Sequence, residues 1–216
     1  MSGAGTRNAD SDAAADRCRQ PRPRLTGSAR RVAVLLVMVA SAGRTFSQPV
    51  EWAQATLSPR FWHATTYDST RAVGVIYGGI EGSEFPNDGL WEWNGTTWVI
   101  RRSLGPGRLY GTALAYDSNR RVVVLFGGRD ENNGETWEWD GIAWQRRSST
   151  GPRPQVGHGM VFDSLRGVTV LFGVTNETWV WDGTEWAVRA TTGPPPRAGH
   201  AMAYDSIRGV TVMHGG

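Results

Sequence analysis

Cysteine is nearly absent from this sequence. The single cysteine, Cys18, lies in an N-terminal leader, so the rest of the chain can form no disulfide framework, thiol nucleophile or cysteine metal site. Lysine is absent altogether, and the motifs Gly-x-Ser-x-Gly, His-Glu-x-x-His and the phosphate loop do not occur. The sequence therefore supplies no catalytic residue, cofactor or metal site, and it favours a protein that is not an enzyme.

An excess of positive charge is also lacking outside the leader. The formal net charge of +3 arises from residues 1–42, which hold seven arginines and three aspartates, whereas residues 43–216 hold sixteen arginines and seventeen acidic residues. A nucleic-acid-binding surface needs clustered, unpaired positive charge. The near-neutral body of the chain argues against nucleic acid as a partner.

No apolar run is long enough to span a bilayer. The longest, Val32–Ala40, follows Arg30-Arg31 and precedes Ala40-Ser41-Ala42, whose small residues suit a signal peptidase. We interpret residues 1–29 as a disordered polar leader and residues 30–42 as a signal-peptide core with its cleavage site. This predicts a secreted, periplasmic or cell-envelope protein; a buried strand beside a disordered N-terminus is the alternative.

Tryptophan, by contrast, is abundant. Nine of the eleven tryptophans lie in three copies of one pattern, Trp91–Trp98, Trp137–Trp144 and Trp179–Trp186. Each copy predicts two short strands around an Asn-Gly or Asp-Gly dipeptide, which tolerates the two positive φ angles of a type I′ turn. Such large rings cannot be buried by one hairpin, so each unit must pack on its neighbours. The residues assigned this structural role are Trp93, Trp98, Trp139, Trp144, Trp181, Trp186, Gly95, Gly141 and Gly183.

A second pattern precedes each tryptophan hairpin. It is an alternating strand, an Asp-Ser-x-Arg turn and an apolar strand such as Val122–Phe126 that ends in glycine. The spacing between successive turn aspartates is 49, 46 and 42 residues, which leaves room for four short strands in each period. No segment after residue 45 shows a helical apolar stripe. The chain is therefore predicted to be all-β, and its turn aspartates are interpreted as turn formers: Asp68, Asp117, Asp163 and Asp205.

These features together resemble the kelch repeat of bacterial secreted proteins. A histidine before an aromatic-Asp pair, a strand closing in Gly-Gly, and Trp-x-Trp with a further tryptophan five residues on recur over roughly residues 50–216. The resemblance implies a β-propeller with one four-stranded blade per repeat. Two positions depart from the pattern, Gly173-Val174 in place of Gly-Gly and Thr112 in place of histidine.

The repeat boundaries predict an incomplete propeller. Residues 50–57 resemble an orphan fourth strand, three repeats follow at about 59–106, 107–152 and 153–194, and half a repeat occupies 195–216. Propellers have about four to eight blades, so we expect a C-terminally truncated fragment of a six- or seven-bladed protein. An unusually small ring and an assembly of two chains are the alternatives.

Two sets of residues form a candidate ligand face. His63, His158 and His200 occupy equivalent repeat positions, where they could form a metal or proton-transfer site or bond a loop carbonyl in each blade. The second interpretation is favoured because no cluster of carboxylates accompanies them. Four arginines precede the first strands: Arg60, Arg108, Arg153 and Arg197. They could bind the carboxylate of an acidic sugar, or they could brace adjacent blades, and the bracing role is favoured.

Two functions from different classes follow. The first is a non-catalytic scaffold that binds a protein or another macromolecule through the variable loops Ile80–Leu90 and Arg129–Thr136. The alternative is a carbohydrate-binding or carbohydrate-active propeller that uses the arginine-bearing face. Tryptophans can stack on sugar rings, but the placement of the nine beside their turns favours packing between blades.

Overall fold

A computed structural model describes residues 57–82, 88–129 and 134–216. The chain divides into two units, Met1–Val50 and Glu51–Gly216, and the first unit lies outside these described residues, as does most of the predicted orphan strand 50–57. Within the described ranges every regular element is a β-strand. No helix there has the length and apolar character needed to cross a membrane.

The strands form three four-stranded antiparallel meanders, or blades, and one hairpin. The first blade comprises β2 (Ala64–Asp68), β3 (Val73–Tyr77), β5 (Leu90–Trp93) and β6 (Trp98–Arg101). The second comprises β7 (Ala113–Asp117), β8 (Val122–Phe126), β9 (Thr136–Trp139) and β10 (Trp144–Ser148). The third comprises β11 (Gly159–Asp163), β12 (Val168–Phe172), β13 (Thr178–Trp181) and β14 (Trp186–Ala190). The hairpin is β15 (Ala201–Asp205) with β16 (Val210–His214), and a short pair joins β1 (Arg60–Phe61) to β4 (Ile80–Glu81).

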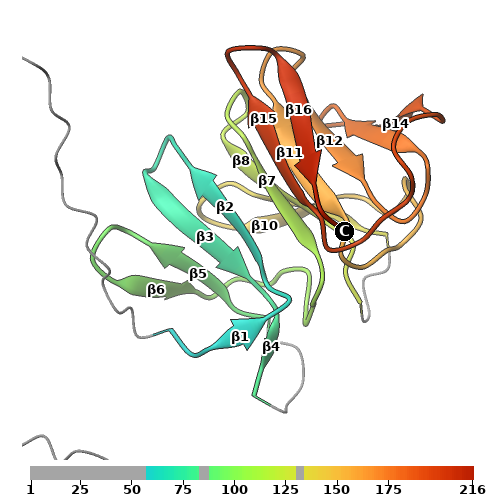
Figure 1. Cartoon of the computed structure of the whole chain (residues 1–216). Helices are drawn as coiled ribbons and strands as arrows, with labels where there is room; N and C mark the ends of the chain where they lie inside the picture. Colours follow the sequence, from blue (N-terminus) through green and yellow to red (C-terminus); the bar gives the residue numbers. More distant parts are fainter. Residues whose placement is uncertain (1–56, 83–87, 130–133) are drawn as a thin grey trace, which may run out of the picture. The chain divides into compact units, whose positions relative to one another are not determined.

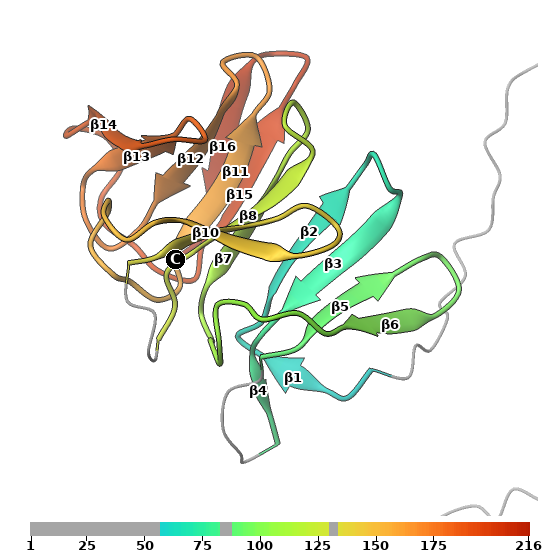
Figure 2. The ribbon, with the colours of Figure 1, turned by 180° about the vertical axis from the view of Figure 1, so that it is seen from behind.

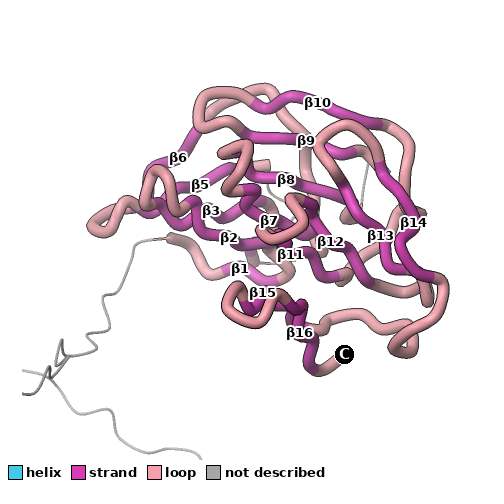
Figure 3. Tube along the Cα trace, turned by 90° about the horizontal axis from the view of Figure 1, so that it is seen from above, coloured by secondary structure: helices cyan, strands magenta, loops and turns pink. Residues whose placement is uncertain are grey.

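The first strands of successive sheets are neighbours. β2 packs beside β7, β7 beside β11, and β11 beside β15 (Figure 1). Seen from above, β2, β7 and β11 lie toward the centre and the fourth strands β6, β10 and β14 toward the outside (Figure 3). The view from behind shows β2, β3, β5 and β6 in succession across the first blade (Figure 2). This is the architecture of a β-propeller, built from four-stranded antiparallel blades.

The tryptophan hairpins form as predicted, but not through type I′ turns. Trp139 pairs with Trp144, so the loop between them has four residues. In that loop Gly141 has a φ of 96°, whereas Asp140 is not in the left-handed region. Instead, Asp140 Oδ1 accepts hydrogen bonds from the amides of Ile142 and Ala143, each at 2.8 Å. Asn94 and Asp182 accept the equivalent hydrogen bonds in the other two hairpins. Each turn is therefore held by a side-chain oxygen that accepts from the loop amides, and it does not need a second residue with a positive φ angle.

The Asp-Ser-x-Arg turns are also held by their aspartates. Asp68 Oδ1 accepts from the amides of Thr70 and Arg71 at 3.0 Å, and Asp68 Oδ2 pairs with Arg71 Nε at 2.6 Å. The same amide bonds recur at Asp117, Asp163 and Asp205. Each aspartate is therefore occupied by its own turn.

The residue after each turn arginine has a left-handed backbone. Its φ is 53° at Ala72, 59° at Arg121, 70° at Gly167 and 67° at Gly209. Glycine adopts this conformation readily, while a side chain there is strained. Two of the four copies thus carry strain that the other two avoid.

Replacing Ala72 with glycine is expected to raise the free energy of unfolding by about 0.5–1 kcal/mol, because the φ of 53° disfavours alanine. The reverse change, Gly167→Ala, should lower it by a similar amount. Urea unfolding of both variants checks the pair. Equal stability of Ala72→Gly and the wild type would contradict the strain.

Tryptophans fill the spaces between blades. Trp139 and Trp144 belong to the core shared by the first and second blades, and Trp181 and Trp186 to that shared by the second and third. Trp144 meets Tyr77 edge-on at 5.3 Å between ring centroids. The other two tryptophans that were assigned a structural role, Trp93 and Trp98, are half-buried, and their ring centroids lie 5.5 Å apart.

At each of the two contacts between blades, a buried glutamate of one blade accepts a hydrogen bond from a tryptophan of the next blade. Trp139 Nε1 donates to Glu92 Oε1 at 3.1 Å, and Glu92 also accepts from Arg71 and Arg101 at 2.6 and 2.7 Å. Burial alone would raise the pKa of Glu92, but these hydrogen bonds outweigh it and lower that pKa. Trp181 and Glu138 repeat the arrangement one blade further on.

Candidate functional site

The loops that enter the first strands surround one cavity of about 440 Å³, which we call the axial pocket. Its walls come from the segments before β2, β7, β11 and β15, so all three blades and the hairpin contribute. The lining residues are Trp62, His63, Gly111, Thr112, Val156, Gly157, His158, Ala198, Gly199 and His200. Two predicted sets of site residues can be located relative to this pocket.

A chain of backbone hydrogen bonds forms part of the pocket wall. The amide of Gly111 donates to Trp62 O at 2.8 Å, that of Gly157 to Gly111 O at 2.9 Å, and that of Gly199 to Gly157 O at 2.7 Å. The four residues hold equivalent positions and left-handed φ angles of 59°, 66°, 73° and 73°. The repeat thus requires a left-handed residue here, and three copies supply glycine.

Trp62 departs from this rule. A non-glycine residue in the left-handed region costs about 1–2 kcal/mol. The indole side chain is nevertheless 55% exposed, so burial of the ring does little to offset that strain. Its ring lies beside that of Tyr110, at 5.5 Å between centroids. Strain of this kind, held at an exposed aromatic residue in a pocket, is a sign of function.

The three repeat histidines all line the axial pocket. His158 is 5% exposed, its Nε2 lies 3.1 Å from Phe126 O, and burial lowers its pKa to about 4. His200 is also buried, and its pKa is lowered first by burial and then by the charge of Arg197. His63 is exposed at the entrance, and partial burial lowers its pKa too. With a pKa of about 4, the His158 ring is neutral at pH 7, and the lowered pKa values of His63 and His200 favour the neutral form of those rings.

Threonine takes the histidine position in the second blade. Thr112 Oγ1 donates to Phe126 O at 2.8 Å, the same carbonyl that His158 approaches from the third blade. Among the described residues, no group of three or more histidine, cysteine, aspartate or glutamate side chains is arranged to hold a metal ion. The pocket chemistry is that of neutral donors, acceptors and one aromatic face.

The four predicted arginines do not line the axial pocket. Arg60 donates to Gly78 O at 3.4 Å and lies 3.6 Å from Glu81, while Arg197 donates to Gly215 O at 2.9 Å. These two hold the same repeat position and brace the end of their own second strand. Arg108 and Arg153 are exposed. The structure thus brings the histidines together and leaves the arginines outside.

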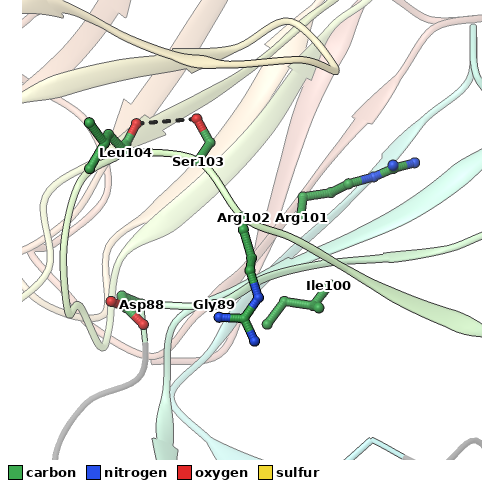
Figure 4. Close-up of a pocket in the computed structure, with 7 residues that line it drawn as sticks. All are labelled: Asp88, Gly89, Ile100, Arg101, Arg102, Ser103 and Leu104. Carbon is green, nitrogen blue, oxygen red and sulfur yellow. Dashed lines mark hydrogen bonds between the residues drawn. The ribbon is translucent and has the colours of Figure 1, made fainter.

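A second cavity, of about 370 Å³, lies beside the first blade (Figure 4). Its lining combines the opposite charges of Asp88 and Arg102 with the exposed apolar side chains of Ile100 and Leu104. It borders residues 83–87, which the structure does not describe. It has neither strained residues nor buried donors of the kind found in the axial pocket.

Trp62 is the site residue that the sequence interpretation missed. Aligning the four residues that precede the histidine position would have found it, because Trp62 stands against Gly111, Gly157 and Gly199. A bulky residue where a repeat otherwise has glycine is a signal readable without coordinates.

Comparison with known proteins supports the fold. No protein-family model and no curated protein matches the sequence. Among solved structures, YjhT aligns with a TM-score of 0.56 at 16% identity, over 68% of this chain and 56% of that one. A mutant Trypanosoma rangeli sialidase displaying trans-sialidase activity aligns with a TM-score of 0.44 at 11% identity, over 64% of this chain and 26% of that one. The chain therefore spans about half of YjhT, and the likeness shows a β-propeller; the resemblance to the kelch family stays a prediction.

Proposed function

We propose that this propeller binds carbohydrate in the axial pocket, with a sugar ring stacked on Trp62. The observation that carries the proposal is the indole of Trp62, 55% exposed and held at a φ of 59° where the equivalent residues are glycine. An exposed aromatic face suits the apolar C–H face of a pyranose ring. Trp62 lines the pocket, and its ring lies beside that of Tyr110.

The rest of the pocket supports the same ligand. Its volume of about 440 Å³ is within the usual range for small-molecule sites, about 300–1,000 Å³. Of the three glycines in the wall, Gly199 has open space where a side chain would stand, so a ligand can approach its backbone closely, whereas Val156 and Ala198 pack against Gly111 and Gly157. Neutral His63 can donate and accept hydrogen bonds to sugar hydroxyls. This site replaces the arginine-bearing face in the carbohydrate hypothesis.

Trp62→Gly provides the test. Glycine suits the left-handed backbone, so the variant should stay within about 1 kcal/mol of the wild type in stability, because relief of strain opposes loss of the Tyr110 contact. Binding to an array of defined bacterial, plant and animal glycans, followed by calorimetric titration of the strongest binder, should fall at least about tenfold. A folded variant with unchanged affinity would refute the proposal.

Binding of a protein through Ile80–Leu90 stays a hypothesis, since residues 83–87 of that loop lie outside the described part of the chain. Pull-down of a protein partner that is lost when this loop is replaced, and kept in Trp62→Gly, would support it. The predicted export signal at residues 30–42 also lies outside the described residues. We propose export on its sequence pattern alone.

A further inference from the structure

We infer that the axial pocket is selective for uncharged sugars and excludes acidic ones such as sialic and uronic acids. The inference rests on the proposed function. Its first support is the lining, which contains no arginine, aspartate or glutamate. A bound carboxylate loses its hydration and must regain strong donors, most often a guanidinium fork. The described residues that line the pocket offer no guanidinium.

The two arginines near the pocket are directed elsewhere. The side chain of Arg60 is only 4% exposed and is engaged by Gly78 O and Glu81. Arg197 donates to Gly215 O at 2.9 Å and to Pro195 O at 3.2 Å. A guanidinium already held by backbone carbonyls and a carboxylate would have to abandon those bonds to reach a ligand. Their charge instead disfavours protonation of His63 and His200.

The backbone also lacks free donors where an anion would need them. Successive glycine amides in left-handed turns often form an anion-binding concavity. Here the amides of Gly111, Gly157 and Gly199 all donate to the carbonyl of the preceding copy. Thr112 Oγ1 is likewise committed to Phe126 O. These three amides and this hydroxyl are therefore not available to a carboxylate, and within the described residues no helix N-terminus exists to supply another donor.

A neutral sugar has no such requirement. Its hydroxyls exchange hydrogen bonds with neutral imidazoles and with water at the entrance, while its apolar face contacts Trp62. Burial of an acidic substituent beside Val156 and Ala198 would cost free energy without compensation. The selectivity thus arises from the absence of a charge partner, as in other sites that reject a ligand by desolvation.

The experiment compares matched sugars that differ only in whether their carboxylates are free or methyl-esterified. Sialylated N-acetyllactosamine is tested against its methyl ester, and polygalacturonate oligosaccharides against the same oligosaccharides with their carboxylates methyl-esterified, by array and calorimetry at pH 7. The neutral member of a bound pair should bind at least about tenfold more tightly. Equal or tighter binding of acidic members, lost in Trp62→Gly, would overturn the selectivity and leave the proposed function intact. Binding of neither member of any pair, or binding unaffected by Trp62→Gly, would refute the proposed function itself and this inference with it.

A gain-of-function variant adds a test in which unfolding of the variant cannot produce the expected result. Ala198 lines the pocket and is exposed, so a longer side chain is accommodated there. Ala198→Arg should raise affinity for the acidic members about tenfold, because it supplies the missing guanidinium. Ala198→Gln adds a side chain without charge and should leave the selectivity unchanged. If Ala198→Arg bound acidic sugars no better than Ala198→Gln, lack of charge would not be the cause.

Discussion

Glu138→Ala is expected to lower the free energy of unfolding by about 3 kcal/mol, the low end for breaking a buried ion pair. Glu138 is 2% exposed and accepts from Arg147 Nε at 2.8 Å, from Trp181 Nε1 at 2.9 Å and from Arg120 Nη1. Alanine would leave the Trp181 donor buried without a partner, between two blades. Both arginines keep partial access to water, which limits the loss. Guanidinium unfolding measures it.

Glu135 supplies the matched control. It makes the same two kinds of bond, to Arg146 Nη1 at 2.7 Å and to Trp137 Nε1 at 2.9 Å, within its own blade. Arg146 is 57% exposed, so this ion pair is worth about 0–1 kcal/mol. Glu135→Ala should therefore cost far less than Glu138→Ala. Equal losses would mean that the bond between blades adds nothing beyond local pairing.

The features set by neighbouring residues could be predicted from the sequence. A hairpin depends on a few consecutive residues, so the Trp139–Trp144 unit and the turn at Asp117 were readable as strands and turns. The detailed turn type was wrong because Asp140 uses its side chain where a type I′ turn would use a second positive φ. That choice depends on a four-residue loop that the pattern alone does not show.

Contacts between blades could not be predicted in this way. The sequence shows Glu92, Glu138 and Val180 at one repeat position, but not that a tryptophan from the next blade points at it. That partner lies 43 or 47 residues away, and only the stacking of sheets brings it near. In the third blade, Val180 occupies the position that glutamate holds in the first two blades. Arg166, the turn arginine there, pairs with Asp163.

Part of the candidate site could be predicted from the sequence. Equivalent repeat positions correctly suggested that His63, His158 and His200 would share a region, because equivalent residues of successive blades lie at similar distances from the axis. The four arginines lie outside the axial pocket, and their spacing from the first strand varies. Arg153 precedes His158 by five residues, whereas Arg60 precedes His63 by three. The structure instead places Gln155 at the third-blade position, where it accepts from the amide of Val174.

His158 is expected to make the protein lose stability as the pH falls below neutrality. Its pKa is about 4 in the folded protein, against about 6.5 when unfolded, because burial opposes the charged ring. Between those values the unfolded chain binds a proton that the folded chain does not, so the free energy of unfolding falls as the pH falls. From pH 7 to pH 5 the loss should be about 2 kcal/mol.

His158→Thr isolates this effect. Threonine already holds the equivalent position in the second blade, as Thr112. The hydroxyl of Thr112 continues to donate to Phe126 O in the variant. Whatever packing the change removes at pH 7, the stability of His158→Thr should fall by about 2 kcal/mol less than that of the wild type between pH 7 and pH 5. His63 and His200 titrate in both proteins, and the charge of His200 contributes less than burial to the lowered pKa of His158. Asp68 and Glu92 have lowered pKa values, so their stabilisation is lost mainly below pH 5, outside the window. Parallel pH profiles for the two proteins would show that His158 takes up its proton in the folded state, and the pocket would then carry positive charge at mildly acidic pH.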